Sequence, residues 1–249
     1  NSDWTQILSE TCNKAGLSFF TSPYSFDLVD QVDQFIPAYK VGSGDITWIE
    51  IIKHMASKGK PILLATGASS MDDVCRAVDE ILHITPEIIL LQCNTNYTAN
   101  KVNYSHLQLK VISTFREKYP GIITGLSDHM PGHVSVLGAV ALGAKVIEKH
   151  FALDRALPVP DAPFSLEPFE FKRMVEGIRV AEQTLIDDSR EELQPEEYQF
   201  KESILYRLVA NKSLVSGESV KAEDFKFLRY SEGIDCRELQ KYLDGKVTY

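Results

Sequence analysis

Polar and charged side chains cluster at six places in this sequence, each directly after a short apolar run. They include hydroxyls, a lysine, carboxylates and imidazoles, which are groups that bind anions or divalent cations and move protons. In parallel α/β folds, the loops after the carboxyl ends of the strands build the active site. We therefore expect function in the clusters at residues 21–25, 40–45, 66–70, 92–97, 127–129 and 148–150.

His129 and His150 end two consecutive apolar runs. Neutral imidazoles on neighbouring strand ends can hold a divalent cation and leave positions open for water and substrate. Such a pattern suits Mn, Zn, Fe or Co better than calcium. On spacing alone, the alternative is that each imidazole only caps its strand with a hydrogen bond.

Lys40 lies inside an apolar run, where a lysine is costly to bury unless it meets a negative partner. With Ser43, Thr66 and Ser127 it could bind a phosphate or a carboxylate, and the nearby glycines would let backbone amides approach. The alternative is a lysine that extends along the strand and keeps its ammonium group in water.

Two carboxylates are candidates for proton transfer or sugar binding. Glu148 shares a strand face with His150 by alternation, and Asp161 lies in a proline-rich loop farther on. For Asp161 the alternative is a turn-forming aspartate. The pattern argues against a hydrolase triad at residues 127–129, because sequence neighbours in a strand point to opposite faces and no nucleophile elbow is present.

The elements that must position these groups follow one cadence over the first two-thirds of the chain. A short apolar run, a polar cluster and an amphipathic helical pattern repeat, which is typical of βα units in a parallel sheet. The helix predicted at residues 1–16 should itself follow a strand, so the pattern begins in the middle of a fold. Strands are predicted at residues 17–20, 38–41, 61–64, 88–91, 122–126 and 145–149.

The sequence predicts two domains. Residues 1–186 form the α/β domain and end in an amphipathic helix. Residues 187–205 are polar and acidic and contain a proline, so we interpret them as a linker. Residues 206–249 alternate short apolar runs with turn residues, which is typical of a small β-rich domain.

Composition excludes several classes of protein. The 249 residues are 44% hydrophobic and 24% charged, as in globular proteins, and a net charge of −9 argues against nucleic-acid binding. No apolar run approaches the roughly 18 residues of a membrane-spanning helix. Four cysteines form neither a disulfide framework nor a CxxC metal site, so reduced thiols and a cytoplasmic location are expected.

Taken together, the motifs resemble those of the sialic acid synthase family, which includes the nonulosonic acid synthases of the spore-coat polysaccharide type. The match runs in order along nearly the whole chain, and several motifs are distinctive by themselves. They are YKVGSGD at residues 39–45, KPILLATG at 60–67, LQCNTNY at 91–97, GLSDH at 125–129, GAVALGAK at 138–145 and IEKHF at 147–151.

The resemblance implies a (β/α)8 TIM barrel followed by a small β-rich SAF (antifreeze-like) domain. On this mapping the strands present are the third to the eighth, and the first two βα units are missing. The domain at residues 206–249 is expected to be truncated. An incomplete barrel would expose two strand edges.

The resemblance also implies roles for individual residues. His129 and His150 match the metal ligands of the family, with Mn²⁺ expected first and Mg²⁺, Co²⁺ or Zn²⁺ as alternatives. Lys40, Glu148 and Asp45 are the expected catalytic groups. The positions expected to bind substrate in this chain are Ser22, Lys40, Ser43, Thr66, Tyr97, Ser127 and Asp161.

Arg229 aligns with an arginine that the SAF domain of one subunit sends into the site of its partner, which implies a domain-swapped homodimer. The chain also departs from the family. Ala65 replaces a serine that is common there, Gln92 stands where some members have histidine, and Asp45 where some have glutamate. The exact sugar is therefore left open.

The activity implied is the condensation of phosphoenolpyruvate with an N-acylated aminosugar of the N-acetylmannosamine type, which yields a nonulosonic acid and phosphate. One alternative is another phosphoenolpyruvate-dependent aldol-type synthase that acts on a phosphorylated aldose. The other is a noncatalytic sugar-binding relative. Neither nucleic acid nor a membrane is an expected partner.

Overall fold

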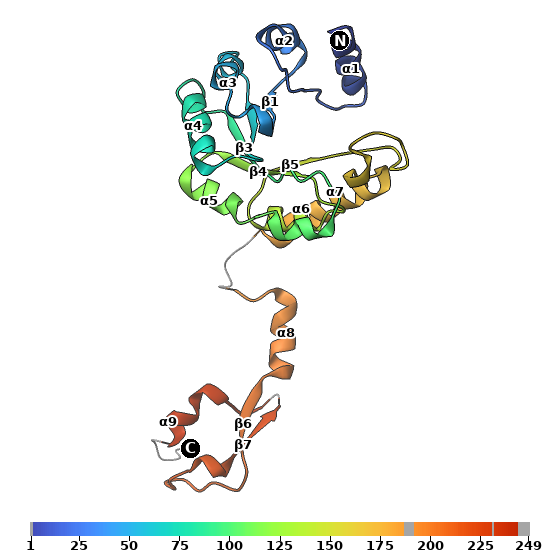
Figure 1. Ribbon diagram of the computed structural model, residues 1–249. Helices are drawn as coiled ribbons and strands as arrows, with labels where there is room; N and C mark the ends of the chain where they lie inside the picture. Colours follow the sequence, from blue (N-terminus) through green and yellow to red (C-terminus); the bar gives the residue numbers. More distant parts are fainter. Residues whose placement is uncertain (1, 187–191, 231, 244–249) are drawn as a thin grey trace. The chain divides into compact units, whose positions relative to one another are not determined.

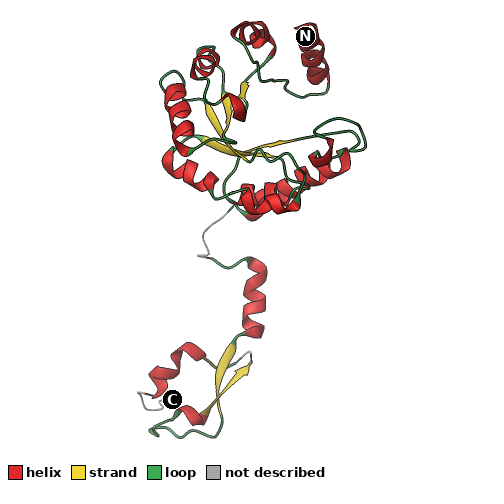
Figure 2. Ribbon diagram, in the orientation of Figure 1, coloured by secondary structure: helices red, strands yellow, loops and turns green. Residues whose placement is uncertain are grey.

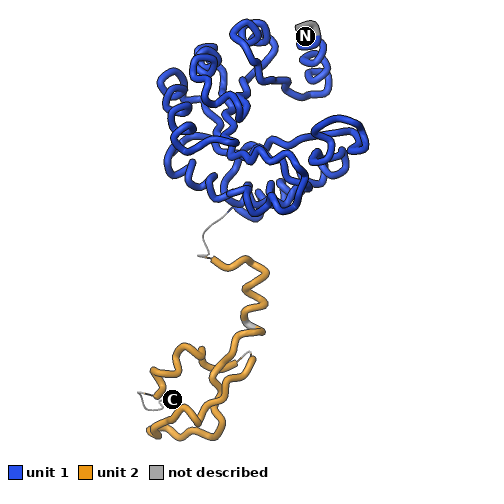
Figure 3. The backbone as a smooth tube through the Cα atoms, viewed as in Figure 1, with its two compact units in different colours: residues 1–186 blue, residues 187–249 orange. Residues whose placement is uncertain are grey.

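The computed structural model describes residues 2–186, 192–230 and 232–243. The chain divides into two compact units, residues 1–186 and 187–249 (Figure 3). The first unit begins with two helices, after which strands and helices alternate. Its elements are α1 (Ser2–Lys14), α2 (Phe26–Val32), β1 (Tyr39–Val41), α3 (Ile49–Ala56), β2 (Ile62–Ala65), α4 (Met71–Leu82), β3 (Ile88–Cys93), α5 (Val111–Lys118), β4 (Ile123–Asp128), α6 (Val134–Ala141), β5 (Val146–Lys149) and α7 (Pro168–Thr184).

The strands of this unit form one five-stranded sheet in the order β1-β2-β3-β4-β5, and every pairing is parallel. The sheet curls, and the helices lie in an arc on its convex side (Figures 1 and 2). The sequence explains this parallel sheet. Parallel strands with helical crossovers are buried on both faces, so each strand is a short apolar run, and the polar clusters mark where the strands end. Five of the six predicted strands are confirmed.

The strand predicted at residues 17–20 is wrong. In the described structure this segment is irregular, and the only pairing near it is a single parallel bridge between Thr21 and Tyr39. The segment at residues 17–20 has a neighbouring strand, β1, on one side only. Its side chains Leu17 and Phe20 are 62% and 42% exposed. A short apolar run at the edge of a sheet lacks the second neighbour that would complete its hydrogen bonding and burial.

The core of the first unit lies between the sheet and its helices. Strand alternation turns one set of side chains outward, where they pack against α2, α3 and α4. Because successive side chains point to opposite faces, the residues between these large apolar ones face the concave side of the sheet. The outward-facing set on the first three strands includes Tyr39, Val41, Ile62, Leu64, Ile88 and Leu90.

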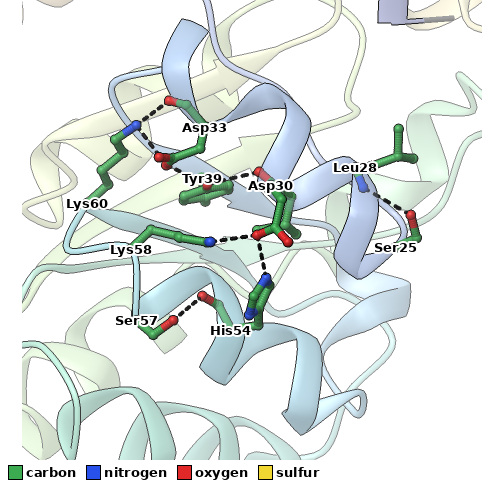
Figure 4. Close-up of polar contacts among 10 residues, drawn as sticks. Ser25, Leu28, Asp30, Asp33, Tyr39, His54, Ser57, Lys58 and Lys60 are labelled. Atoms are coloured by element: carbon green, nitrogen blue, oxygen red, sulfur yellow. Dashed lines mark hydrogen bonds and ion pairs between the residues drawn. The ribbon is translucent and has the colours of Figure 1, made fainter.

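A polar network fastens α2 and the turn after it to the amino-terminal ends of β1 and β2 (Figure 4). The hydroxyl of Tyr39 donates to Oδ1 of Asp33 at 2.7 Å, and Nζ of Lys60 lies 2.8 Å from the same atom. One turn earlier, Asp30 accepts hydrogen bonds from Lys58 at 2.5 Å and from His54 at 2.8 Å. The network lies at the amino-terminal ends of the parallel strands, opposite the ends that carry the polar clusters, and is suited to holding α2 on the sheet.

The second unit contains α8 (Pro195–Ile204), an antiparallel sheet in the order β7-β6-β8 and α9 (Leu239–Leu243). The strands are β6 (Tyr206–Ala210), β7 (Phe225–Arg229) and β8 (Ile234–Asp235). Leu208, Val220 and Phe225 form its core. Residues 231 and 244–249 of the predicted small domain lie outside the described residues.

Helix α8 lies inside the interval 187–205 that the sequence predicts to be a linker; residues 187–191 are outside the described part. Its proline is at the first helical position, and acidic residues occupy the first turn. Proline and carboxylates both favour the start of a helix. None of the helices in residues 2–186, 192–230 and 232–243 has the length and apolar character needed to cross a membrane.

Candidate functional site

The concave face of the sheet carries an ion pair that joins its two outermost strands, β1 and β5. Nζ of Lys40 lies 3.1 Å from Oε2 of Glu148, and the side chain of Lys40 is 11% exposed. The hydroxyl of Ser127, on β4, donates to Oε1 of the same carboxylate at 2.9 Å. The structure thus brings three predicted site residues together and gives the buried lysine a negative partner.

Ser43, Gly67 and Cys93 form a second polar group where β1, β2 and β3 end. The amide of Gly67 donates to Oγ of Ser43 at 3.0 Å. A Cβ on Gly67 would lie 2.7 Å from that oxygen and 2.4 Å from Cγ2 of Thr95, so a larger residue there would force Ser43 and Thr95 to move. Burial raises the pKa of the Cys93 thiol, and hydrogen bonds with Ser43 and Ser127 oppose the rise.

The two histidines lie together at the ends of β4 and β5. Their ring centroids are 5.0 Å apart. Nδ1 of His129 is 2.9 Å from the carbonyl oxygen of Asn94, and Nδ1 of His150 is 3.5 Å from Oδ2 of Asp161. Burial lowers the pKa of both imidazoles below the usual value. Both rings are therefore neutral at physiological pH.

This arrangement fits a divalent cation. Because the Asn94 carbonyl can only accept, Nδ1 of His129 donates, and its Nε2 keeps a lone pair for a metal. Metal-binding histidines commonly turn their second nitrogen toward a carbonyl or a carboxylate in this way. No group of three or more His, Cys, Asp and Glu side chains is placed to hold a metal within residues 2–186, 192–230 and 232–243. A cation on His129 and His150 would therefore also need oxygen ligands from water or substrate.

Two aromatic side chains enclose the histidine rings. The ring centroid of Tyr97 is 4.2 Å from that of His129, and the centroid of Phe164 is 4.9 Å from that of His150. Tyr97 and Phe164 also contact each other edge to face at 5.5 Å. They come from different loops, one after β3 and one after β5. They pack around the two rings, and His129 is buried, whereas the side chain of His150 stays 28% exposed.

The loop after β3 is held by its own amide side chains. Asn96 donates to Oδ1 of Asn103 at 2.7 Å, and Asn103 donates to Oγ1 of Thr98 at 2.8 Å. The side chain of Asn94 donates to the carbonyl of His106 at 2.8 Å. This network fixes both the Asn94 carbonyl that His129 contacts and the ring of Tyr97.

Thr66 and Asp45 are placed differently from the residues above. The hydroxyl of Thr66 donates to the carbonyl of Leu91 at 3.0 Å, and its side chain lines a pocket of about 550 Å³ with residues of α4 and α5. Asp45 ends a 3₁₀ turn, Ser43–Asp45, and folds its carboxylate back over Gly42. Neither side chain joins the Lys40–Glu148 pair.

Ser22 lines a different pocket, between α1 and α2, although the bridge at Thr21 brings its backbone next to β1. Arg229 belongs to the second unit. There its guanidinium lies 5.2 Å from the ring centroid of Tyr206. The site described here is built from the first unit alone.

One feature next to the site is absent from the sequence-based predictions. Asp128 and Lys149 face each other across β4 and β5, and both side chains are fully buried, with Nζ 2.7 Å from Oδ2. Ser135 donates to the same oxygen at 2.7 Å. The sequence did contain a signal for this ion pair. Asp128 and Lys149 are charged residues at positions of two neighbouring strands that face the helices, where apolar residues are usual.

Comparisons with known proteins give a consistent picture. Residues 1–190 match the NeuB family. An uncharacterized protein of Methanocaldococcus jannaschii is 34% identical over 242 residues, covering 96% of this chain and 70% of that protein. Pseudaminic acid synthase of Campylobacter jejuni is 32% identical over 251 residues, covering 99% of this chain and 71% of that protein.

Among solved structures, an N-acetylneuraminic acid (sialic acid) synthetase from Leptospira borgpetersenii, in complex with citrate, is similar to this chain. The TM-score is 0.74 and the sequence identity is 28%. The alignment covers 81% of this chain and 70% of that one.

Proposed function

Because the chain belongs to the NeuB family, we propose that it condenses phosphoenolpyruvate with an N-acylated aminosugar of the N-acetylmannosamine type to form a nonulosonic acid. The names of its relatives, pseudaminic acid synthase and sialic acid synthetase, support this class of product. One observation carries the proposal. The Lys40–Glu148–Ser127 group and the two neutral histidines come from strand ends on one face of the sheet.

The first group suits the anionic substrate. Lys40 supplies a positive charge in a chain of net charge −9, and Ser43, Ser127 and Cys93 supply hydrogen-bond donors. Phosphoenolpyruvate would share Lys40 with Glu148, so the carboxylate limits how strongly the resting site attracts other anions. The close approach at Gly67 keeps Ser43 in place.

His129 and His150 would hold a divalent cation, with Mn²⁺ as the first choice. When bound, the cation supplies a Lewis acid for the carbonyl group of the sugar. The Asn94 carbonyl and the Asp161 carboxylate orient the two rings, and Tyr97 and Phe164 pack against them.

The reaction forms a bond between C3 of phosphoenolpyruvate and the aldehyde carbon of the open-chain sugar. Water adds at C2, and the bond from C2 to the phosphate oxygen breaks as the C2 carbonyl forms. Of the two protons of the water, one reaches the former aldehyde oxygen and the other leaves with the phosphate. Glu148 lies between Lys40 and Ser127 and is our candidate for accepting the proton of the attacking water. Asp161, next to His150, is the candidate for orienting the sugar.

The remaining parts of the proposal concern the assembly. The curled five-stranded sheet would be part of a (β/α)8 barrel, and residues 206–249 would form an SAF domain. Arg229 of that domain would reach the site of a second subunit in a domain-swapped homodimer. The exposed β7, on which only Phe225 is buried, is compatible with such a role.

A substrate panel tests the activity. The purified protein, with Mn²⁺ and phosphoenolpyruvate, is offered N-acylated mannosamines and related aminosugars, and phosphate release and the sugar acid product are measured. Turnover of an N-acylated sugar is expected. Turnover of phosphorylated aldoses alone would favour the aldol-type alternative, and binding of a sugar without turnover would favour a noncatalytic relative.

Two variants test the roles of the groups. His129→Ala should abolish the activity that Mn²⁺ restores to the chelated wild type, whereas His83→Ala, at the end of α4, should not. Lys40→Met should raise the KM for phosphoenolpyruvate, and Lys53→Met, in an exposed pair with Glu80, serves as its control. An unchanged KM in Lys40→Met would remove the lysine from the anion site.

A further inference from the structure

The buried ion pair of Asp128 and Lys149 lies directly behind the two histidines. The two residues are register partners on β4 and β5, and each is followed in sequence by one of the histidines, His129 or His150. By strand alternation the ion pair faces the helices and the imidazoles face the concave side. The pair therefore fixes the ends of both strands at the point where the rings begin.

The network around the pair also holds the backbone on the far side of His129. The amide of Met130 donates to Oδ1 of Asp128 at 3.1 Å, and Nζ of Lys149 donates to the carbonyl of Met130. The residues before and after His129, Asp128 and Met130, are therefore both held by this network. Ser135 ties the network to α6.

The backbone around His150 is held in a similar way. Lys149 precedes it, and the amide of Leu166 donates to the His150 carbonyl at 2.9 Å. Phe151 then forms a parallel bridge with Leu166. Both imidazoles therefore project from backbone that is fixed before and after them.

Stability alone does not explain such a pair. Removing two charges from water is costly, and well-packed apolar residues in place of a buried ion pair often leave stability unchanged or raise it. What an ion pair with all its hydrogen bonds supplies is a defined geometry. On β4 and β5 that geometry is the relative position of two strand ends.

We propose that Asp128 and Lys149 are positioning residues that set the relative position of His129 and His150 and thereby the affinity of the site for a divalent cation. The inference rests on the proposed function for its metal. It predicts that Asp128 and Lys149 control the affinity for the cation although neither residue contacts it.

The test compares three variants with the wild type. Asp128→Asn removes the negative charge and leaves the lysine unpaired. The double variant Asp128→Asn/Lys149→Met removes both charges, and we expect it to fold even where the single variant does not. Lys60→Met is the matched control, because it breaks an ion pair at the opposite end of the strands. Mn²⁺ affinity is measured by titration followed by electron paramagnetic resonance.

A second readout needs no metal. Long-range ¹H–¹⁵N NMR spectra of the histidine rings report the tautomer and the surroundings of His129 and His150 in the metal-free protein. We expect altered ring signals and Mn²⁺ binding about 10- to 100-fold weaker in the double variant, the range found when outer partners of metal ligands are removed. In Lys60→Met both readouts should match the wild type, whatever its stability.

The outcomes separate the two proposals. Unchanged ring signals in the double variant would overturn the positioning role, as would wild-type Mn²⁺ affinity. A wild-type protein that binds no Mn²⁺ would overturn the metal site of the proposed function, and the ring spectra would still decide whether the pair positions the imidazoles.

Discussion

At the scale of single residues, the site depends on how closely the backbone after β2 approaches its neighbours. Gly67 lies against Ser43, Cys93 and Thr95. A methyl group there would be nearer to Ser43 and Thr95 than real Cβ atoms come, and in tight contact with Cys93. Gly44, one residue after Ser43, has open space around its α-carbon. The two glycines therefore have different reasons to be present.

We predict that Gly67→Ala raises the KM for phosphoenolpyruvate about tenfold or more, because the added methyl displaces Ser43 by disturbing its 3.0 Å hydrogen bond. Steady-state kinetics check this, with circular dichroism to confirm the fold. Gly44→Ala is the matched control and should stay close to the wild type. Equal KM values in the two variants would contradict the account of the Ser43 contact.

The sequence predicted those site residues whose side-chain direction follows from the alternation of a strand. Lys40 and Glu148 each follow from a single strand, and the structure pairs them. Cys93 lies in the predicted cluster at residues 92–97, but nothing in its strand pattern assigned it a role. Phe164 could not be predicted, because it reaches His150 only through the fold of a long loop.

At the scale of elements, the network at the amino-terminal end of β1 sets how α2 is held. Asp33 joins the turn after α2 to β1 through Tyr39 and to the start of β2 through Lys60. Burial opposes ionisation of Asp33, but the hydrogen bonds from Lys60 and Tyr39 outweigh it and lower its pKa. The ionised carboxylate is thus stabilised by folding.

This network predicts a pH-dependent effect of Asp33→Asn. Because the pKa is lower in the folded state, the stability that Asp33 contributes is present above its unfolded pKa of about 3.9 and is lost as pH falls through the folded value. We expect the variant to lower the free energy of unfolding by about 1 kcal/mol at neutral pH, a value reduced for partial exposure.

Urea unfolding curves at pH 7 and at about pH 3 measure this effect, and the difference between variant and wild type should shrink at the lower pH. Glu117→Gln, on the exposed side of α5, is the control and should show no such dependence. A difference that stays constant with pH would indicate that Asp33 acts without its charge.

The elements themselves could be predicted where local signals suffice. Five strands follow from apolar runs with polar ends, and α4 follows from its Ser70 and Asp73 capping box. The irregular segment at residues 17–20 could not be predicted, because its state depends on a neighbour in space. Pro195 was interpreted as a linker residue, although at the first position of a helix it favours α8.

At the scale of the whole molecule, the two units have separate hydrophobic cores. The second relies on three buried residues, among which Leu208 is 2% exposed. Both tryptophans of the chain, Trp4 and Trp48, belong to the first unit. Their fluorescence therefore reports the unfolding of the first unit only.

We predict that Leu208→Ala destabilises the second unit by about 2–5 kcal/mol, the usual cost of such a cavity, and leaves the first unit intact. Hydrogen exchange should accelerate at the amides of β6, while the urea midpoint seen by tryptophan fluorescence stays unchanged. Leu228→Ala, at a position 45% exposed on β7, is the control. A shifted fluorescence midpoint would show that the two cores unfold together.

The alternation at the ends of β4 and β5 has a consequence for assembly. If β5 slipped by one residue against β4, Lys149 would turn to the concave face and Glu148 would enter the apolar layer beneath the helices. Each misplaced charge would lose its partner at once. The charged side chains at the ends of β4 and β5 therefore also favour the correct strand register during folding, because a sheet with the wrong register would be less stable.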